Sequence, residues 1–303
     1  MVVTGAAIAT GLAAEGAMVV AADQNLAGAE EIAASIREAG QNAVATGVDV
    51  RERDQMHDLA ERAVTEFGRL DVWFNNAGVA MARPFLDVTA EDWHQTQSVN
   101  GLGTLLGCQE AARMMIRRSH GGKIINTASI AGRQGFARLA AYSASKFGVV
   151  ALTQAAARAL AEHRITVNAF APGLVRTPML DAIQDARPER AQPEFGGPLL
   201  GRESTPADIL PTAVFLASSD SDYLTGQVLP VESGIAADAF VDSKVVPSGS
   251  STGVICLTNR PSPLASAARR WDSVNCWTAA RYSSNSMSRM FESIMITAPG
   301  TWK

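Results

Sequence analysis

The chain has little of several things that mark specialised classes of protein. Its 303 residues include only three cysteines and four histidines, and no two cysteines form a CxxC pair. This sparse usage excludes a disulfide framework and a zinc motif, so we expect no bound metal. A net charge of -4 gives no broad basic field, which argues against nucleic acid and membrane surfaces as partners. No apolar run reaches membrane-spanning length, and we expect a cytoplasmic protein.

What the chain does contain is a regular alternation of short apolar runs and longer amphipathic segments through about residue 235. The apolar runs predict strands at 2–3, 17–22, 42–50, 70–78, 122–129, 164–173 and 226–233. The amphipathic segments predict helices at 26–40, 54–68, 95–118, 142–163 and 206–218. This alternation indicates an α/β fold with a doubly wound, Rossmann-like parallel sheet in a three-layer αβα arrangement. Such sheets bind ligands beyond the carboxyl ends of their strands.

The alternation stops in the last part of the chain, residues 241–303. This segment of 63 residues contains 12 serines and three of the five tryptophans, with no sustained period. We therefore expect one domain over residues 1–240, followed by an irregular and poorly ordered tail. The tail's Trp271, Trp277 and Trp302 leave open the alternative that it packs on a neighbour.

The sequence Tyr-Ser-Ala-Ser-Lys at 142–146 opens the helix expected after the fifth strand. A spacing of four positions places the Tyr142 phenol and the Lys146 ammonium on one face of that helix. A neighbouring positive charge favours the phenolate and lowers a tyrosine pKa that is ordinarily about 10. Such a tyrosine can exchange a proton with a substrate oxygen near neutral pH. The pair is common on helix surfaces, so it needs support from other residues.

Further polar residues fall at or near the predicted carboxyl ends of strands. Ser129 ends one strand, the Asn-Asn-Ala-Gly sequence at 75–78 ends another, and Pro172-Gly173 ends a third. Asn100 lies on the long helix after residue 78, and Thr177 comes just after the third strand end. In a doubly wound sheet these positions meet at the ligand-binding edge.

These residues, taken together, resemble the classical short-chain dehydrogenase/reductase family. The resemblance covers roughly residues 1–235 and rests on 75–78, Asn100, Ser129, 142–146 and 171–179, in the family's order and spacing. It implies hydride transfer between NAD or NADP and a carbonyl or alcohol substrate, by a homodimer or homotetramer. The expected reaction interconverts a secondary alcohol and a ketone. The sequences ASIAGRQGF and ITVNAFAPGLVRTPM also resemble those of dehydrogenases of small polyols and acetoin-like compounds.

The resemblance assigns a role to each of four residues. It implies that Tyr142 is the catalytic acid/base and that Lys146 holds the nicotinamide ribose and lowers the tyrosine's pKa. Ser129 would steady the substrate oxygen, and Asn100 would support a water molecule in the proton relay.

The expected cofactor follows from Asp23, which closes the second predicted strand. A carboxylate there would accept hydrogen bonds from both hydroxyls of an adenosine ribose, whereas a 2′-phosphate would meet like charge. The resemblance therefore favours NAD over NADP. It likens Asp49 and Val50 to the pair that flanks adenine, and Thr177 to the residue that contacts the nicotinamide amide. In full, it implies cofactor contacts from Thr4, Gly5, Asp23, Asp49, Val50, Asn76, Ala77, Gly78, Tyr142, Lys146, Pro172, Gly173 and Thr177.

The start of the chain departs from the family's pattern. Thr4-Gly5 matches the beginning of the glycine-rich turn, but Gly16 follows Gly5 by only eleven positions. In one register the turn is absent and residues 8–16 are the end of the first helix. In the other, residues 5–11 form the turn, and the helix is a single turn at 12–15. A single turn is too short to return the chain along a strand of ordinary length.

Two hypotheses about function therefore remain open. In the first, the chain is an NAD-dependent oxidoreductase with a small alcohol or ketone substrate. In the second, it is a catalytically impaired remnant or dimerisation scaffold that cannot bind the dinucleotide, because the glycine-rich turn is incomplete.

Overall fold

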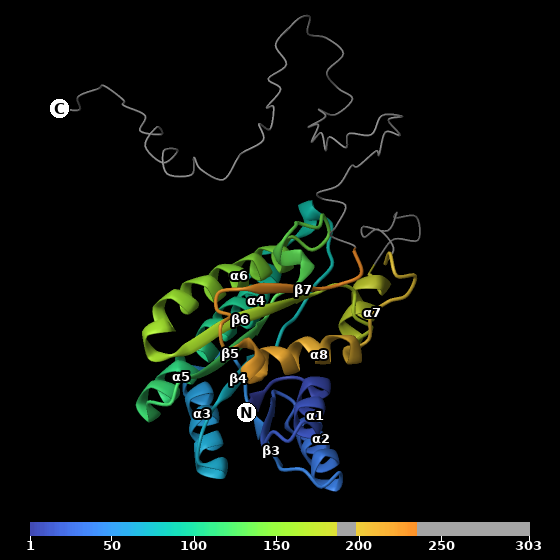
Figure 1. Ribbon diagram of the computed structural model, residues 1–303. Coiled ribbons are helices and arrows are strands. Elements are labelled where there is room, and N and C mark those ends of the chain that lie inside the picture. The colour runs from blue at the N-terminus through green and yellow to red at the C-terminus, as the bar shows by residue number, and fades with distance from the viewer. Residues whose placement is uncertain (187–197, 235–303) are drawn as a thin grey trace, which may run out of the picture. The chain divides into compact units, whose positions relative to one another are not determined.

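The computed structural model of the protein describes residues 1–186 and 198–234 (Figure 1). The chain divides into two units, 1–244 and 245–303, and all described residues belong to the first. The tail predicted at 241–303 lies outside the described residues, as do its three tryptophans. Within the described part, no helix combines the length and apolar character needed to cross a membrane.

Strands and helices alternate along the described chain much as the apolar pattern predicts. The strands are β1 (Val2–Val3), β2 (Val19–Asp23), β3 (Ala43–Gly47), β4 (Val72–Asn75), β5 (Gly122–Thr127), β6 (Ile165–Pro172) and β7 (Val228–Val231). The α-helices are α1 (Ala6–Ala14), α2 (Leu26–Glu38), α3 (Arg53–Phe67), α4 (Ala90–Gln97), α5 (Gly103–Arg118), α6 (Ala140–Leu160), α7 (Pro178–Asp185) and α8 (Pro206–Ala217). The short α7 lies in a stretch where the sequence predicts no element.

The strands form one parallel sheet in the order β3-β2-β1-β4-β5-β6-β7. The shortest strand, β1, is the third in this order, where Val2 is paired with Val20 of β2 and with Trp73 of β4. The strand order reverses on either side of β1, which creates a crevice at the carboxyl ends of the strands. The predicted fold class, a doubly wound parallel α/β sheet, is confirmed.

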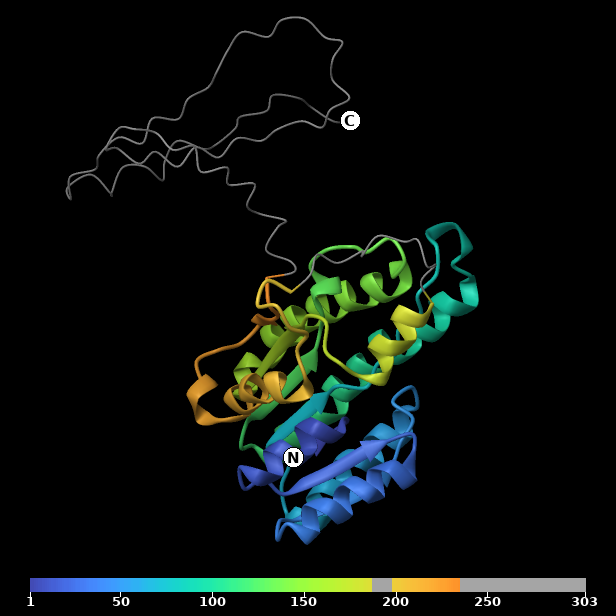
Figure 2. The same cartoon turned by 90° about the vertical axis from the view of Figure 1, so that its right-hand side faces the viewer.

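Helices cover both faces of this sheet (Figures 1 and 2). One apolar core joins α1, α2 and α8 to the sheet through side chains such as Leu12, Ile36 and Ile209. The other joins α3, α5 and α6 through side chains such as Leu59 and Met115. Burial on both faces explains why the strands are continuous apolar runs rather than alternating ones.

The first βαβ unit follows the first of the two registers. Helix α1 begins directly after Gly5 and has nine residues, so the register with a one-turn helix at 12–15 is wrong. Gly11 lies within α1 and is buried, and a Cβ there would overlap the side chain of Leu210 on α8. Gly11 is thus a helix-packing residue, not part of a phosphate turn. At about 13 Å, α1 is long enough to return the chain along the short β1.

The long helix predicted at 95–118 is interrupted. A π-helical turn at Ser98–Leu102 separates α4 from α5. The Thr104 hydroxyl donates a 2.7 Å hydrogen bond to the carbonyl oxygen of Asn100 within this turn. Such turns insert one extra residue into a helix and are frequent at functional sites. Sequence periodicity does not predict it, because the flanking helices keep the ordinary helical period.

Candidate active site

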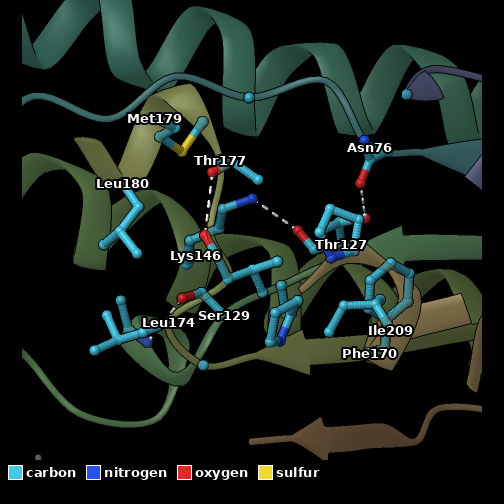
Figure 3. A pocket seen from close by; sticks show the side chains of 18 of the residues that line it. Asn76, Thr127, Ser129, Lys146, Phe170, Leu174, Thr177, Met179, Leu180 and Ile209 are labelled. Carbon is cyan, nitrogen blue, oxygen red and sulfur yellow. Dashed lines mark hydrogen bonds between the residues drawn. The ribbon is translucent and has the colours of Figure 1, made fainter. Parts of the chain in front are cut away.

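A cavity of about 560 Å³ lies at the carboxyl ends of the strands (Figure 3). Its volume is within the ordinary range for small-molecule and cofactor sites. Of the residues that the sequence predicts for the site, those that line the cavity are Thr4, Gly5, Asp23, Asn76, Ala77, Gly78, Ser129, Tyr142, Lys146, Pro172, Gly173 and Thr177.

Three predicted residues do not line this cavity. Asp49 is paired with Arg51, whose Nε donates to Asp49 Oδ1 at 2.9 Å, and these hydrogen bonds lower the pKa of the Asp49 carboxyl. The Val50 side chain packs against Gly103 and lines a separate small hollow. Asn100 is buried behind the cavity wall. The structure thus gathers the predicted site except for its adenine-flanking pair and Asn100.

Tyr142 and Lys146 share one face of the first two turns of α6, as their spacing predicts. The Lys146 Nζ lies 5.6 Å from the centroid of the Tyr142 ring. The same Nζ donates a 2.7 Å hydrogen bond to the carbonyl oxygen of Thr127 at the end of β5 (Figure 3). Ser129 lies two residues beyond Thr127, and its hydroxyl accepts a hydrogen bond from the Ala131 amide at 3.1 Å. Strand β5 and helix α6 therefore bring the three predicted side chains to one cavity.

Burial dominates the proton equilibria of this pair. It raises the pKa of the Tyr142 phenol, while a hydrogen bond with the Ser129 side chain acts in the opposite direction. It also lowers the pKa of the Lys146 ammonium to about 8. The net shift of the Tyr142 pKa is opposite to the predicted one, because desolvation disfavours the phenolate more than nearby groups stabilise it. Tyr142 is therefore a protonated phenol at neutral pH.

The turn that follows β4 is held by Thr4. The Thr4 hydroxyl oxygen accepts hydrogen bonds from the amides of Asn76 and Ala77, both at 2.8 Å. The Thr127 hydroxyl donates to Asn76 Oδ1 at 2.9 Å, as Figure 3 shows. Gly5 has a φ of 130°, and a Cβ there would overlap Asn76 Nδ2, so only glycine fits this close approach. These contacts place the 76–78 backbone along the cavity wall.

Asn75, the first residue of the Asn-Asn-Ala-Gly sequence, belongs to the core instead. Its Oδ1 accepts a 2.7 Å hydrogen bond from the Trp73 indole, and its Nδ2 donates to Asn126 Oδ1 at 2.9 Å. Asn126 in turn donates to the Thr153 hydroxyl on α6 at 2.9 Å. This buried network ties β4 and β5 to the helix that carries Tyr142.

Asn100 is buried, and both the oxygen and the nitrogen of its side-chain amide form hydrogen bonds. Its Oδ1 accepts from the Val79 amide, and its Nδ2 donates to the Val79 carbonyl, both at 2.9 Å. The Nδ2 also donates to the Ser145 hydroxyl at 2.9 Å. The side chain of Asn100 therefore joins the loop after β4, at Val79, to helix α6.

Sequence reasoning missed the apolar wall beside Tyr142. Its side chains come from two loops and from α7, and no periodic pattern marks them. The wall consists of Ile130, Phe136, Leu139, Leu174 and Ile183, together with Met179 and Leu180.

The opposite part of the cavity fits an anionic, ribose-bearing cofactor. Ala6, Ala7 and Ile8 line it, and the amides of these first three helical residues of α1 have no acceptor within the helix. Such amides, with the positive end of the helix dipole, are suited to a phosphate group. Asp23 lies exposed at the end of β2 within the same lining. The N-terminus of α1 therefore opens into the cavity.

A Tyr-Lys pair, a serine hydroxyl and a phosphate-compatible helix end thus meet at one cavity of a parallel sheet, an arrangement that fits an oxidoreductase. A family model described as Enoyl-(Acyl carrier protein) reductase matches residues 4–236. The chain belongs to the short-chain dehydrogenase/reductase family and is an oxidoreductase of that family.

Two curated relatives match most of the domain. The chain is 40% identical to a diacetyl reductase [(S)-acetoin forming] of Staphylococcus epidermidis, covering 77% of this chain and 97% of that protein. It is 42% identical to the L-2,3-butanediol dehydrogenase of Corynebacterium glutamicum, covering 76% of this chain and 93% of that protein.

Solved structures agree with the fold. The crystal structure of levodione reductase matches with a TM-score of 0.72 at 31% identity, over 77% of this chain and 93% of that chain. A Beutenbergia cavernae protein assigned as an NAD(P)-dependent gluconate 5-dehydrogenase matches with a TM-score of 0.71 at 36% identity. That match covers 78% of this chain and 96% of the other, whose structure contains NADP at low occupancy. One relative of this chain therefore binds a nicotinamide dinucleotide.

Proposed function

We propose that the protein is an NAD-dependent reductase of small uncharged ketones, with the oxidation of the corresponding secondary alcohol as its reverse reaction. The observation that carries the proposal is that Ser129, Tyr142 and Lys146 line one cavity together with the free amides of α1. The similarity to a diacetyl reductase and a butanediol dehydrogenase supports an acetoin-like substrate.

A nicotinamide dinucleotide, when bound, would supply or accept the hydride. The amides of α1 and the carboxylate of Asp23 would hold its phosphates and adenosine ribose, and Lys146 its nicotinamide ribose. In the reducing direction the Ser129 hydroxyl would hold the substrate carbonyl oxygen, and the Tyr142 phenol would donate a proton to that oxygen. The raised pKa of Tyr142 keeps this proton in place at neutral pH.

NAD is the proposed cofactor rather than NADP. The Asp23 Oδ1 accepts a hydrogen bond from the Asn25 amide at 2.9 Å, and in the described part of the chain Asp23 forms no ion pair. Its carboxylate would accept hydrogen bonds from ribose hydroxyls but would repel a 2′-phosphate.

The cavity wall supports an uncharged substrate. Among the described residues that line the cavity, only Asp23 and Lys146 carry charge. The wall beside Tyr142 is apolar, and its Phe136 and Leu139 are buried. Apolar walls favour the methyl groups of a compound such as diacetyl or acetoin over a carboxylate-bearing sugar acid.

We also propose that the protein is a cytoplasmic homodimer or homotetramer. An exposed face of α6 carries Phe147, Ala151 and Ala155, which lie at helical spacing. The Phe147 side chain is 45% exposed, and an apolar helix face of this kind is suited to a second copy of the chain. Light scattering at micromolar concentration measures the assembly, and a strictly monomeric mass would contradict this part of the proposal.

The test of the function is a titration with NADH followed by fluorescence, and then turnover of diacetyl followed at the NADH absorbance band. We expect saturable NADH binding in the micromolar range and oxidation of NADH that depends on diacetyl. NADH binding without turnover of any small ketone would contradict the proposed substrate class. Absence of NADH binding would favour the second hypothesis, a dimerisation scaffold without cofactor.

A further inference from the structure

Ser145 lies between Tyr142 and Lys146 in the sequence, and its side chain is fully buried. Its hydroxyl donates a 2.7 Å hydrogen bond to the carbonyl oxygen of Tyr142, one turn earlier in α6. The same hydroxyl oxygen accepts a 2.9 Å hydrogen bond from Asn100 Nδ2. Ser145 therefore connects the π-helical turn to the backbone of the residue that would donate the proton.

Asn100 extends this connection to the loop after β4. Its amide group bonds both the N–H and the C=O of Val79, which follows Gly78 directly. A Cβ at Gly78 would lie 3.3 Å from Asn100 Oδ1 and 3.6 Å from Lys146 Nζ, so loop and lysine are closely packed. A continuous set of hydrogen bonds thus runs from Val79 through Asn100 and Ser145 to Tyr142.

Every side-chain hydrogen of Asn100 and Ser145 that can be donated has an acceptor. The two hydrogens of the Asn100 amide go to the Val79 carbonyl and the Ser145 hydroxyl, and the single hydroxyl hydrogen goes to the Tyr142 carbonyl. Removing the hydroxyl would leave an Asn100 N–H buried without an acceptor. The amide group would then gain freedom to turn away from Val79, and its hold on the loop would weaken.

We propose that Ser145 is a positioning residue for the reaction, acting through Asn100 to set the loop at 76–79 against Tyr142 and Lys146. This inference rests on the proposed oxidoreductase function, because it assigns Ser145 a role in that reaction. This loop lines the cavity, so its displacement would shift the bound cofactor relative to the Tyr142 phenol. Hydride transfer is sensitive to such a displacement.

The test compares Ser145→Ala with Ser221→Ala. Ser221 is also fully buried, accepts from an amine (Lys123 Nζ, 3.1 Å) and donates to main-chain carbonyls, but it lies outside the cavity lining. Hydrogen exchange of the Val79 amide, measured by NMR without any ligand, reports the loop directly. Steady-state kinetics with NADH and diacetyl report its consequence.

In Ser145→Ala we expect exchange at Val79 to accelerate at least about tenfold and kcat to fall at least about tenfold, with a smaller change in the KM for diacetyl. In Ser221→Ala neither should change, even if the melting temperature falls. The double variant Ser145→Ala/Asn100→Ala should be no slower than Asn100→Ala alone, because Ser145 acts through Asn100.

Unchanged exchange and kcat in Ser145→Ala, or equal losses in Ser221→Ala, would overturn the proposal. If Ser145→Ala does not fold, Ser145→Cys takes its place, since a thiol fills the space but is a weak acceptor; unchanged exchange at Val79 in that variant would also overturn it. Absence of turnover in the unsubstituted chain would reject the proposed function, and the positioning role with it. Turnover in the unsubstituted chain with an unaffected Ser145→Ala rejects the positioning role alone.

Discussion

Lys146 donates a 2.7 Å hydrogen bond from its Nζ to the carbonyl oxygen of Thr127, so that an ammonium on helix α6 is held by the end of strand β5. The Thr127 side chain, on the same residue, donates to Asn76 Oδ1 at 2.9 Å. Thr127 thus holds both Lys146 and the turn after β4 that contains Asn76. The lysine's position is set by the sheet as well as by its helical spacing from Tyr142.

Replacing Tyr142 by phenylalanine removes the phenol hydroxyl, the proposed proton donor, and keeps the aromatic ring. We expect the turnover of diacetyl to fall by roughly 100-fold or more, the usual contribution of a positioned acid/base. The apolar wall that packs on the ring remains, so the affinity for NADH should change less than threefold. Steady-state kinetics and a fluorescence titration measure the two quantities. Retained turnover would show that another group donates the proton.

The buried Lys146 should make stability depend on pH in a defined direction. Its pKa is about 8 in the folded protein, below the ordinary value of roughly 10.4 for an unfolded lysine. Between these two values the unfolded chain binds more protons, so this group makes the free energy of unfolding rise with pH, by at most about 3 kcal/mol. Urea unfolding at pH 7.5 and at pH 9.5 measures the rise. It should be smaller in Lys146→Met, and equal rises in both proteins would contradict the assigned shift.

Asp23 should distinguish between the two dinucleotides. In Asp23→Ala the affinity for NADH should fall about tenfold, the loss expected for hydrogen bonds to a charged group. The affinity for NADPH should stay the same or improve, because a repulsive charge is removed. Asp58→Ala, an exposed carboxylate on α3, changes the net charge equally and should affect neither. An equal loss for both cofactors in Asp23→Ala would remove the ribose assignment.

Replacement by alanine should change the free energy of unfolding in opposite directions at two glycines, Gly107 and Gly148. A Cβ at Gly107 of α5 would overlap Asn75 Oδ1, which accepts the Trp73 hydrogen bond in the core. Gly107→Ala should therefore lower the free energy of unfolding by about 1–3 kcal/mol. A Cβ at Gly148 of α6 would meet no heavy atom of the described residues within 4 Å, apart from its own stretch of helix. Gly148→Ala should raise stability by about 0.5–1 kcal/mol, because alanine loses less backbone entropy in a helix.

Urea unfolding of both glycine variants beside the parent chain provides the measurement. Stability unchanged by Gly107→Ala would mean that the strand network accommodates a methyl group, and that Asn75 is held less tightly than its hydrogen bonds indicate.

The sequence predicted the order of strands and helices and twelve of the residues that line the cavity. Strands that are buried on both faces can be recognised in the sequence as continuous apolar runs. The helical period places Tyr142 and Lys146, four positions apart, on one face of a helix. Ser129 and Asn76 could be found because parallel strands place their carboxyl ends at one edge. Asp49 and Val50 were predicted to contact the cofactor, yet neither lines the cavity.

Other features depended on contacts between residues far apart in the chain. One is the close approach of Gly11, within α1, to Leu210 of α8. Desolvation decided that the pKa of Tyr142 is raised rather than lowered. Local periodicity shows which face of an element is apolar, so the sequence by itself determined the elements, their order and the polar residues at the strand ends. Close packing, burial and hydrogen bonds across the sheet arise only when the elements meet, and these decided the register of α1, the π-helical turn at Asn100 and the apolar wall beside Tyr142.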